Sequence, residues 1–252
     1  MKSKQREMAR KLASYGTIFC NDAFGSAHRA HASTAIVCEF MRLNVAGFLM
    51  EKELAYLGEA IEKPQRPFVA ILGGAKVSDK LAVVENLLGK VDVLIIGGGM
   101  AYTFLKARGH DVGKSLCETD QLDYARRMLA LAAERKVRFL LPVDNVAAEA
   151  FAADAAHKIV GNDIPAGWMA LDIGPQTSAE YAEAIRTAKT VVWNGPMGCF
   201  EMPAFAKGTL AVCQAIADSG ALSIIGGGDS VSAVNQSGLA GKMTHISTGG
   251  GA

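Results

Sequence analysis

The stretch FVAILGGAKVSDK, residues 68–80, joins five apolar residues to two glycines and two lysines. A short apolar run bounded by glycine is typical of a buried strand. Glycine allows the backbone to approach a ligand closely and to take a positive φ. A strand, a glycine turn and a helix start in succession are a common way of presenting backbone N–H groups to phosphate.

Four further runs repeat this pattern, namely VLIIGGGM (93–100), TVVWNGPMG (190–198), LSIIGGGDS (222–230) and THISTGGG (244–251). With RFLLPV (138–143) they predict six strands. Helical patterns occupy the intervening residues 78–88, 101–108, 119–135, 178–188 and 203–218. Alternating strands and helices predict an α/β fold, a doubly wound, Rossmann-like parallel sheet of six strands with helices on both faces. Ligands of such sheets bind beyond the carboxyl ends of the strands, where all five glycine turns would lie.

The chain before residue 68 reads differently. Residues 49–61 align apolar side chains on one helical face, and Pro64 to Pro67 then break the pattern, which predicts a domain boundary. Met8, Leu12 and Tyr15 indicate an amphipathic helix near the start rather than a signal peptide. Residues 17–34 read as one strand and a loop, too short for a domain.

Composition excludes several classes of protein. The 252 residues carry a net charge of +1, which gives no electrostatic case for nucleic acid or a membrane surface. No apolar run reaches the roughly 18 residues that span a bilayer. Five widely spaced cysteines without a CxxC pair predict buried, reduced thiols in a cytoplasmic protein.

Two lysines follow the first glycine turn. Lys76 and Lys80 fall near a helix start, where positive charge costs a few tenths to about 1 kcal/mol, so a bound anion would explain them better than solvent exposure. The Walker A pattern is absent, and so is GxGxxG, which argues against the alternative of a nicotinamide-dependent dehydrogenase.

Other candidates leave two interpretations open. Asp229 suits a helix N-cap or a ligand of Mg²⁺. Glu201 suits a helix start or a hydrogen bond to ribose hydroxyls. Asn194, Gly195 and Pro196 suit a tight turn as well as a binding loop. Arg29 could clamp a carboxylate or phosphate, whereas the flanking His28 and His31 are too few for a metal site.

The segments NDAFGSAHRAHAST, ILGGAKVSDK, IIGGGMAYTFL, VVWNGPMGCFE, GGGDS and HISTGGGA occur in this order and spacing in phosphoglycerate kinases, and the whole chain resembles that family. The resemblance implies a glycolytic phosphotransferase that moves a phosphoryl group between 1,3-bisphosphoglycerate and ADP, giving 3-phosphoglycerate and ATP with Mg²⁺. It implies a monomeric full-length protein with two domains. Residues 1–47 would be a remnant of the 3-phosphoglycerate domain, 48–62 the connecting helix and 63–252 the nucleotide domain.

The resemblance also implies roles for matching residues. Lys76 with the backbone of Gly227, Gly249 and Gly250 would stabilise the phosphoryl group in transfer, and Arg29 would hold 3-phosphoglycerate. Asp229 would be the metal ligand. The nucleotide would be bound by Gly73, Gly74, Lys80, the turn of Gly97, Gly98 and Gly99, Asn194, Pro196, Glu201, Gly227, Gly228, Asp229 and Ser230.

The sequence departs from the family pattern at both ends. The family's earlier substrate motifs and its last segment have no counterpart among these residues. We therefore expect a chain that binds Mg-nucleotide with little or no turnover. The alternative is a non-catalytic nucleotide-binding fragment whose first residues act as an interaction module.

Overall fold

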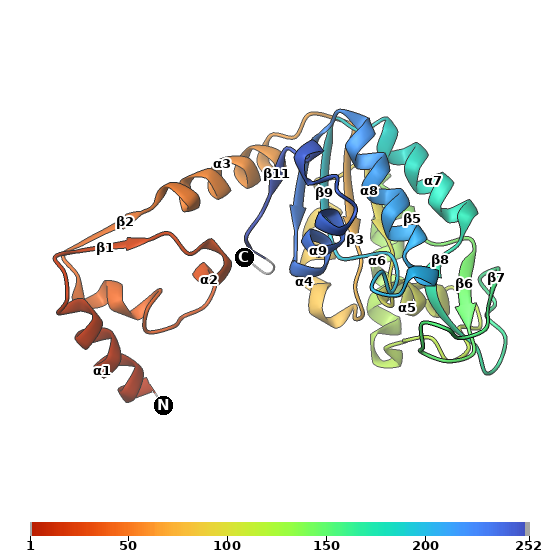
Figure 1. Cartoon of the computed structure of the whole chain (residues 1–252), viewed down its shortest axis with the longest axis horizontal. Coiled ribbons are helices and arrows are strands. Elements are labelled where there is room, and N and C mark those ends of the chain that lie inside the picture. The colour runs from red at the N-terminus through yellow and green to blue at the C-terminus, as the bar shows by residue number, and fades with distance from the viewer. Residues whose placement is uncertain (1, 250–252) are drawn as a thin grey trace. The chain divides into compact units, whose positions relative to one another are not determined.

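The computed structural model describes residues 2–249, and the chain divides into two compact units (Figure 1). The first unit runs to Glu62 and resumes at Ser247, and the second comprises Lys63–Ile246. The sequence predicts a domain that continues to residue 252. In the structure the last strand of the second unit ends at Ile246, and helix α3 (Phe48–Glu62) belongs to the first unit.

A six-stranded parallel sheet forms the centre of the second unit, which confirms the predicted fold. Its order is β11–β10–β9–β3–β4–β5. The strands are β3 Phe68–Leu72, β4 Val93–Ile96, β5 Arg138–Leu140, β9 Thr190–Asn194, β10 Leu222–Gly226 and β11 His245–Ile246. Leu72 of the central β3 pairs with both Ile96 and Asn194. The glycine turns that follow β3, β4, β9 and β10 therefore all lie at the carboxyl ends of the strands. We call this side of the sheet the glycine edge.

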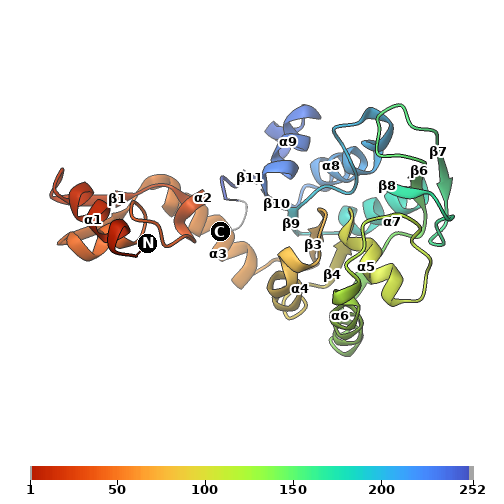
Figure 2. The ribbon, with the colours of Figure 1, turned by 90° about the horizontal axis from the view of Figure 1, so that it is seen from below.

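Helices cover both faces of this sheet (Figure 2). One face carries α4 Leu81–Leu87, α5 Met100–Ala107 and α6 Leu122–Glu134, and the other carries α7 Pro175–Arg186, α8 Lys207–Ser219 and α9 Gly228–Gln236. The strands alternate between two cores. Phe68, Ala70 and Leu72 pack on the first face, and Val69 and Ile71 pack on the second. This alternation buries every residue of β3.

Several predicted helices begin differently in the structure. Short 3₁₀ turns precede three α-helices: η2 Ser78–Lys80 before α4, η3 Thr119–Gln121 before α6 and η4 Pro203–Phe205 before α8. The N-cap residue of α6 is Gln121, which makes no side-chain capping bond. Helix α7 begins at Pro175 rather than at residue 178, because proline suits a first helical position.

A separate three-stranded antiparallel sheet was not predicted from the sequence. It has the order β7–β6–β8 and comprises β6 Asn145–Ala148, β7 His157–Val160 and β8 Met169–Ile173. Its short strands lack the glycine-ended apolar pattern, and three of the four residues of β7 are exposed. The sheet brings Met169 to Ile173 beside the glycine edge of the larger sheet.

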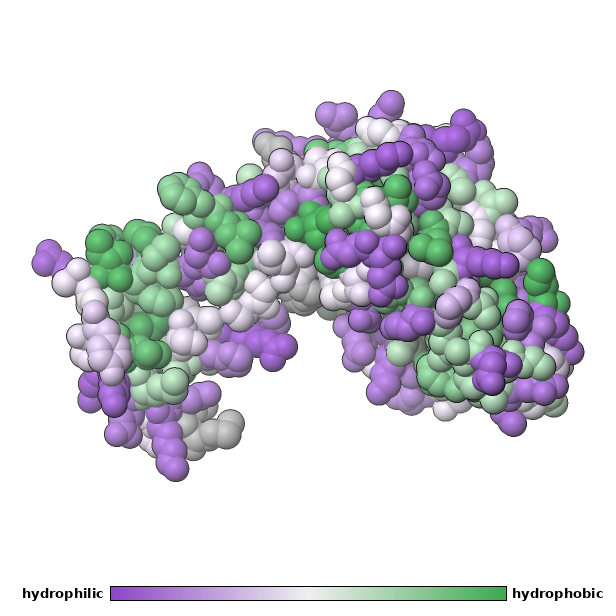
Figure 3. Space-filling view, viewed as in Figure 1, coloured by the Kyte–Doolittle hydropathy of each residue, from purple (hydrophilic) through white to green (hydrophobic). Residues whose placement is uncertain are grey.

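The first unit is small and thinly packed. It contains α1 Lys2–Ala13, β1 Ile18–Asn21, α2 Phe24–Ala27, η1 Ile36–Phe40, β2 Leu43–Ala46 and α3. The predicted first helix is present, but Ala9 is its buried residue, whereas Met8 and Tyr15 are exposed. Strands β1 and β2 pair in parallel, and Figure 3 shows apolar residues gathered on the surface of this unit.

Two observations concern the cysteines and membrane-spanning helices. The five cysteines are free, but Cys20 is exposed and of the five only Cys213 is buried, so the prediction of buried thiols is wrong for the others. No helix among residues 2–249 combines the length and apolar character needed to cross a membrane.

Candidate functional site

The first three glycine turns of the sheet edge pack against one another. The amide of Gly73 donates to the carbonyl of Asn194 at 2.9 Å, and that of Gly98 donates to the carbonyl of Met197 at 3.0 Å. A Cβ on Gly73 would overlap the carbonyl oxygen of Pro196, and one on Gly98 would lie 2.6 Å from the amide nitrogen of Gly74. Close backbone packing is thus the structural reason for these glycines.

This packing changes the expected role of the first turns. The amides of Gly73, Gly74, Gly97 and Gly98 all donate to backbone carbonyls within the protein. They are therefore not available to a phosphate, contrary to the expectation drawn from the pattern. Gly74, Gly98 and Gly99 instead line a cavity with their backbone, so the three turns form its rigid floor.

Lys80 crosses from η2 to the end of β9. Its ammonium donates to the side-chain Oδ1 of Asn194 at 2.5 Å and to the carbonyl oxygen of the same residue at 3.0 Å. Burial lowers the pKa of Lys80 to about 8, although the carboxylates of Asp229 and Asp79 act in the opposite direction. The hydrogen bonds to neutral oxygens leave the positive charge of this partly buried ammonium group uncompensated, which favours the binding of an anion.

The fourth glycine turn differs from the first three. Gly228, Asp229 and Ser230 form the first turn of α9, and within the described chain their amides have no acceptor. The N-cap residue is Gly227, and Asp229 makes no capping bond, so the interpretation of Asp229 as a cap is wrong. The Ser230 hydroxyl accepts a hydrogen bond of 2.6 Å from the Gly195 amide, which joins this turn to the third.

A cavity of about 290 Å³ lies among these groups. Its lining unites many of the residues singled out in the sequence: Gly74, Lys76, Lys80, Asn194, Gly195, Gly227, Gly228, Asp229 and Ser230. Lys76 is exposed, and among the described residues its ammonium makes no hydrogen bond or ion pair. The smaller cavity therefore offers two lysines and a set of free helix amides to an anion.

An adjoining cavity of about 540 Å³ is mainly apolar. Gly74, Ala75 and Asp229 line both cavities, so the two meet. Pro196 and Glu201, which the sequence singled out, line the larger one. Leu116 and Phe151, which it did not, stand exposed at the same cavity. Apolar walls beside a cavity with two lysines could accept a heterocyclic ring with attached phosphates.

Asp172, on β8, is a buried carboxyl group behind this cavity that the sequence did not reveal. Its oxygens accept hydrogen bonds from the amides of Gly208 at 2.8 Å and Ile173 at 2.9 Å. Burial raises its pKa to about 7, although both hydrogen bonds favour the charged form. The bond to Gly208 fixes the start of α8 after the loop that carries Glu201.

Cys199 is part of the cavity lining. Burial, with the nearby carboxylates of Glu201 and Asp172, raises the pKa of this thiol to about 11. A thiol that stays protonated at neutral pH is a poor nucleophile. Covalent catalysis by this cysteine is therefore not indicated.

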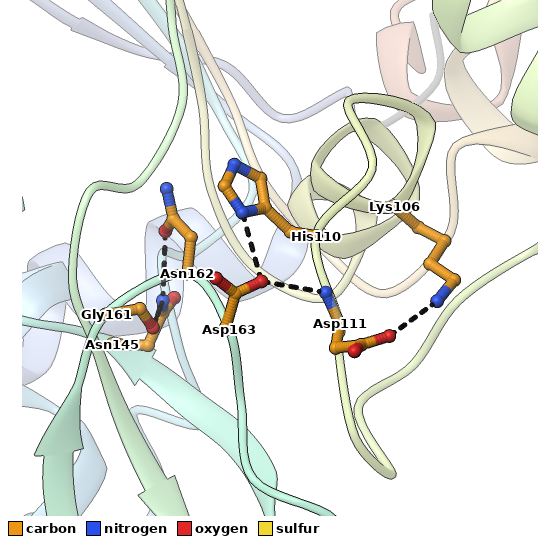
Figure 4. A network of polar contacts seen from close by, with 7 residues as sticks. All are labelled: Lys106, His110, Asp111, Asn145, Gly161, Asn162 and Asp163. Carbon is orange, nitrogen blue, oxygen red and sulfur yellow. Dashed lines mark hydrogen bonds and ion pairs between the residues drawn. The ribbon is translucent and has the colours of Figure 1, made fainter.

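A polar network supports the segment that runs from α5 to Glu118 (Figure 4). The Asp163 carboxylate accepts a 3.1 Å hydrogen bond from the Asp111 amide and lies 3.2 Å from Nδ1 of His110. These contacts hold the pKa of Asp163 below its usual range. Asn145, fully buried, donates to the carbonyl of Gly161 and accepts from the hydroxyl of Tyr102. The network joins α5 to the β6–β7–β8 sheet, whose β8 contributes to the larger cavity.

The remaining candidates belong to the other unit. Arg29 is exposed in the turn after α2, where its amide donates to the Ser26 carbonyl at 3.0 Å. Glu53, buried on α3, accepts hydrogen bonds from the Thr248 amide at 2.6 Å and hydroxyl at 2.8 Å. Gly249 follows this contact, and Gly250 lies outside the described residues. No group of three or more potential metal ligands occurs within residues 2–249.

A family model described as phosphoglycerate kinase matches residues 1–252. The chain is 64% identical over 249 residues to a phosphoglycerate kinase of Acidobacterium capsulatum, covering 98% of this chain and 62% of the relative. It is 60% identical over 249 residues to that of Clostridium novyi, covering 98% and 63%. The chain thus spans about 62% of the length of such relatives.

Solved structures give the same match. The structure of phosphoglycerate kinase from Coxiella burnetii superposes with a TM-score of 0.90 at 47% identity, covering 97% of this chain and 64% of that one. The phosphoglycerate kinase of Pyrococcus horikoshii gives a TM-score of 0.82 at 34% identity, covering 98% and 64%.

Proposed function

The chain belongs to the phosphoglycerate kinase family, and from this premise we propose that its second unit binds an adenine nucleotide with Mg²⁺. The observation that supports this proposal is that the two cavities adjoin each other. The larger is apolar, and the smaller contains Lys80, a half-buried cation whose hydrogen bonds within residues 2–249 go to the neutral oxygens of Asn194. A nucleotide has the complementary halves, a flat base and a polyphosphate.

The roles follow from the position of each group. Phosphate oxygens would accept hydrogen bonds from Lys80 and from the amides of Gly228 to Ser230, with Asn194 orienting the lysine. The base would lie against Pro196 and the backbone of Gly74 and Gly98. Glu201, an exposed carboxylate on the larger cavity, would accept hydrogen bonds from ribose hydroxyls. Gly73 would support this site through its packing on the Pro196 carbonyl.

The residues present fit a magnesium ion that enters with the nucleotide. Asp229 and Asp79 are the carboxylates of the smaller cavity. Mg²⁺ usually binds nucleotides through one or two carboxylates, with phosphate oxygens and waters filling its octahedron. Asp229 stands where the cavities meet and would be the protein ligand. When bound, the ion would supply neutralising charge to the phosphates.

In the full reaction a phosphoryl group would pass between 1,3-bisphosphoglycerate and ADP. Such transfer needs positioning and charge neutralisation rather than a protein nucleophile. Lys76, exposed and with no side-chain partner in the part of the chain that the structure describes, would meet the equatorial oxygens of the moving group, with the backbone of Gly227 and Gly250. Arg29 would hold 3-phosphoglycerate. The free cysteines are consistent with a cytoplasmic enzyme.

We propose that this 252-residue chain binds Mg-nucleotide with little or no turnover. Ordering of two substrates supplies roughly 7–11 kcal/mol of barrier reduction in well-positioned reactions. The relatives devote more than a third of their length to residues that have no match here. The exposed apolar residues of the first unit favour a second role, as an interaction module.

Calorimetric titration with MgADP, followed by a coupled assay with 3-phosphoglycerate and MgATP, tests both proposals. We expect saturable binding that Lys80→Met weakens more than tenfold, the order expected for a charged hydrogen-bonded contact. We expect no turnover above background. Absent binding would reject the nucleotide site, and turnover at the rate of a full-length relative would reject the proposed inactivity.

A further inference from the structure

The carboxylate of Glu118 holds the turn that carries the two lysines. One oxygen accepts a hydrogen bond from the Ser78 hydroxyl at 2.5 Å, and the other accepts from the Ser78 amide at 3.0 Å. The two residues are 40 positions apart in the chain. Ser78 lies midway between Lys76 and Lys80. The contact with Glu118 is therefore made near the middle of the turn that carries both lysines, residues 74–80, which we call the lysine turn.

Glu118 is itself fixed by the fold. Its amide donates a 3.1 Å hydrogen bond to the hydroxyl of Thr103, which is buried on α5. Two earlier residues of the same segment are also bonded. The Lys114 amide donates to the carbonyl of Trp168, just before β8, at 2.7 Å, and the Ser115 hydroxyl accepts from the amide of Ala170, in β8, at 2.9 Å. The carboxylate therefore extends from a restrained backbone.

Other restraints act on the lysine turn at Gly74, at Val77 and at the Lys80 ammonium, which is held by Asn194. The amide of Gly74 bonds to the Pro196 carbonyl at 3.3 Å, and the Val77 side chain is fully buried. Ala75 and Lys76 between them are exposed. Among the residues that the structure describes, the Lys80 amide bonds to the Val77 carbonyl of the same turn. The double contact of Ser78 with Glu118 thus joins the centre of the lysine turn to α5 through Thr103, while the Met100 amide, which donates to the Gly74 carbonyl at 3.0 Å, joins its start.

The segment that ends at Glu118 also borders the larger cavity. Lys114, Ser115 and Leu116 line it. One short piece of chain therefore touches the apolar cavity through Leu116 and the lysine turn through Glu118.

We propose that Glu118 is a positioning residue that sets Lys76 and Lys80 for the phosphates of the nucleotide. This inference rests on the proposed nucleotide site. Hydrogen bonds from Ser78 and the Val77 backbone hold the pKa of Glu118 below its usual range against the opposing effect of partial burial, so the group is charged at neutral pH.

The sign of the effect separates positioning from simple electrostatics. A carboxylate near a phosphate site repels the phosphate, so its neutralisation would strengthen binding if charge alone mattered. A positioning role predicts the opposite, because the released turn must be ordered again when the phosphates bind.

The test compares Glu118→Gln, Ser78→Ala and the double variant with the wild-type chain, titrated with MgADP and with adenosine. Glu134→Gln is the matched control, since Glu134 is an exposed glutamate whose side chain has no hydrogen-bond partner among the described residues. We expect Glu118→Gln to weaken MgADP binding about three- to tenfold, the order of a charged hydrogen bond only partly recovered by the amide. Ser78→Ala, which changes no charge, should act in the same direction, and the double variant should be no weaker than Glu118→Gln.

Adenosine binding should stay within about twofold of wild type in all variants, because the base half of the site is unaltered. Unchanged or tighter MgADP binding by both single variants would overturn the inference, and so would an equal loss for adenosine, which indicates general damage. Wild-type chain that binds no MgADP would instead reject the nucleotide site itself. Ser78→Ala keeps the test decisive if Glu118→Gln unfolds.

Discussion

The Lys80 ammonium lies 2.5 Å from Oδ1 of Asn194, and this neutral amide takes the place that a carboxylate occupies in an ion pair. With its pKa near 8, Lys80 loses its proton just above neutral pH in the free protein. A bound phosphate would raise that pKa, so binding above pH 8 requires proton uptake. We expect MgADP affinity to be constant from pH 7 to 7.5 and to fall by up to about tenfold per unit near pH 9.

Calorimetry in buffers of different ionisation enthalpy measures this proton uptake directly. Lys80→Met serves as the control, because a residue that cannot titrate should give weak binding without this pH dependence. Affinity of the wild-type chain that stays flat to pH 9.5 would contradict the assignment.

The two lysines should differ in their contribution to nucleotide affinity. Lys80 is half-buried and oriented by Asn194, whereas Lys76 is exposed and would act on the phosphoryl group in transfer. We expect Lys76→Ala to weaken MgADP binding by less than about threefold, the effect of a solvent-screened charge, while Lys80→Ala weakens it more than tenfold. Equal losses in titrations of the two variants would remove the distinction.

Substitution by alanine should destabilise the protein at Gly73 but leave its stability almost unchanged at Gly228. A Cβ at Gly73 would overlap the Pro196 carbonyl, so Gly73→Ala should reduce the free energy of unfolding by about 3 kcal/mol or more in urea titrations. At Gly228 nothing lies within 4 Å of the added carbon, so stability should change by less than about 0.5 kcal/mol.

Gly228→Ala should nevertheless bind MgADP several-fold more weakly, because the methyl group would stand at the amides offered to phosphate. The stable fold of this variant makes the binding measurement interpretable. Wild-type affinity in Gly228→Ala would mean that the phosphates do not approach α9 closely.

Asp172 should make stability depend on pH below neutrality. Its pKa is about 7 in the fold but near 3.9 in an unfolded chain. Between these values the folded state keeps a proton that the unfolded state has lost, so this group's contribution to stability falls as pH rises. Asp172→Asn should remove about 2 kcal/mol of that decline between pH 5 and 7.

Urea unfolding at the two pH values measures the effect. Asp154→Asn is the control, since Asp154 is exposed and has no polar partner among the described residues. An identical pH dependence in wild type and Asp172→Asn would show that Asp172 does not titrate in this range.

The first unit should promote association. Ile18, Leu43, Val45 and Phe48 are exposed, the last at 87%, whereas Phe24 and Val37 are buried. Exposed apolar patches favour contacts between molecules. We expect concentration-dependent sedimentation that the double substitution Val45→Lys and Phe48→Ser diminishes. A monomer at all concentrations would refute this.

The parallel sheet was predictable because each strand is a buried apolar run that ends in glycine. The role of those glycines was not, because close backbone packing and close ligand approach require the same residue. Gly73 and Gly228 look alike in the sequence, yet one is enclosed by protein and the other faces open space.

The unpredicted residues act across long separations in the chain. Asp172 lies inside a short strand and meets Gly208 36 positions later, and Glu118 meets Ser78 40 positions earlier. Neither spacing leaves a local pattern. Lys80 and Asn194 are 114 positions apart. From the sequence, only the resemblance to phosphoglycerate kinases indicated that the two residues belong to one site.

The packed glycine turns also determine how the amides of this edge exchange with deuterium. Those of Gly73, Gly97 and Gly98 are bonded within the sheet edge and can exchange only when it opens, with the free energy of global unfolding. The Gly228 amide has no acceptor within the described chain and should exchange while the protein stays folded. A bound nucleotide should slow the Gly228 amide and leave the other three unchanged.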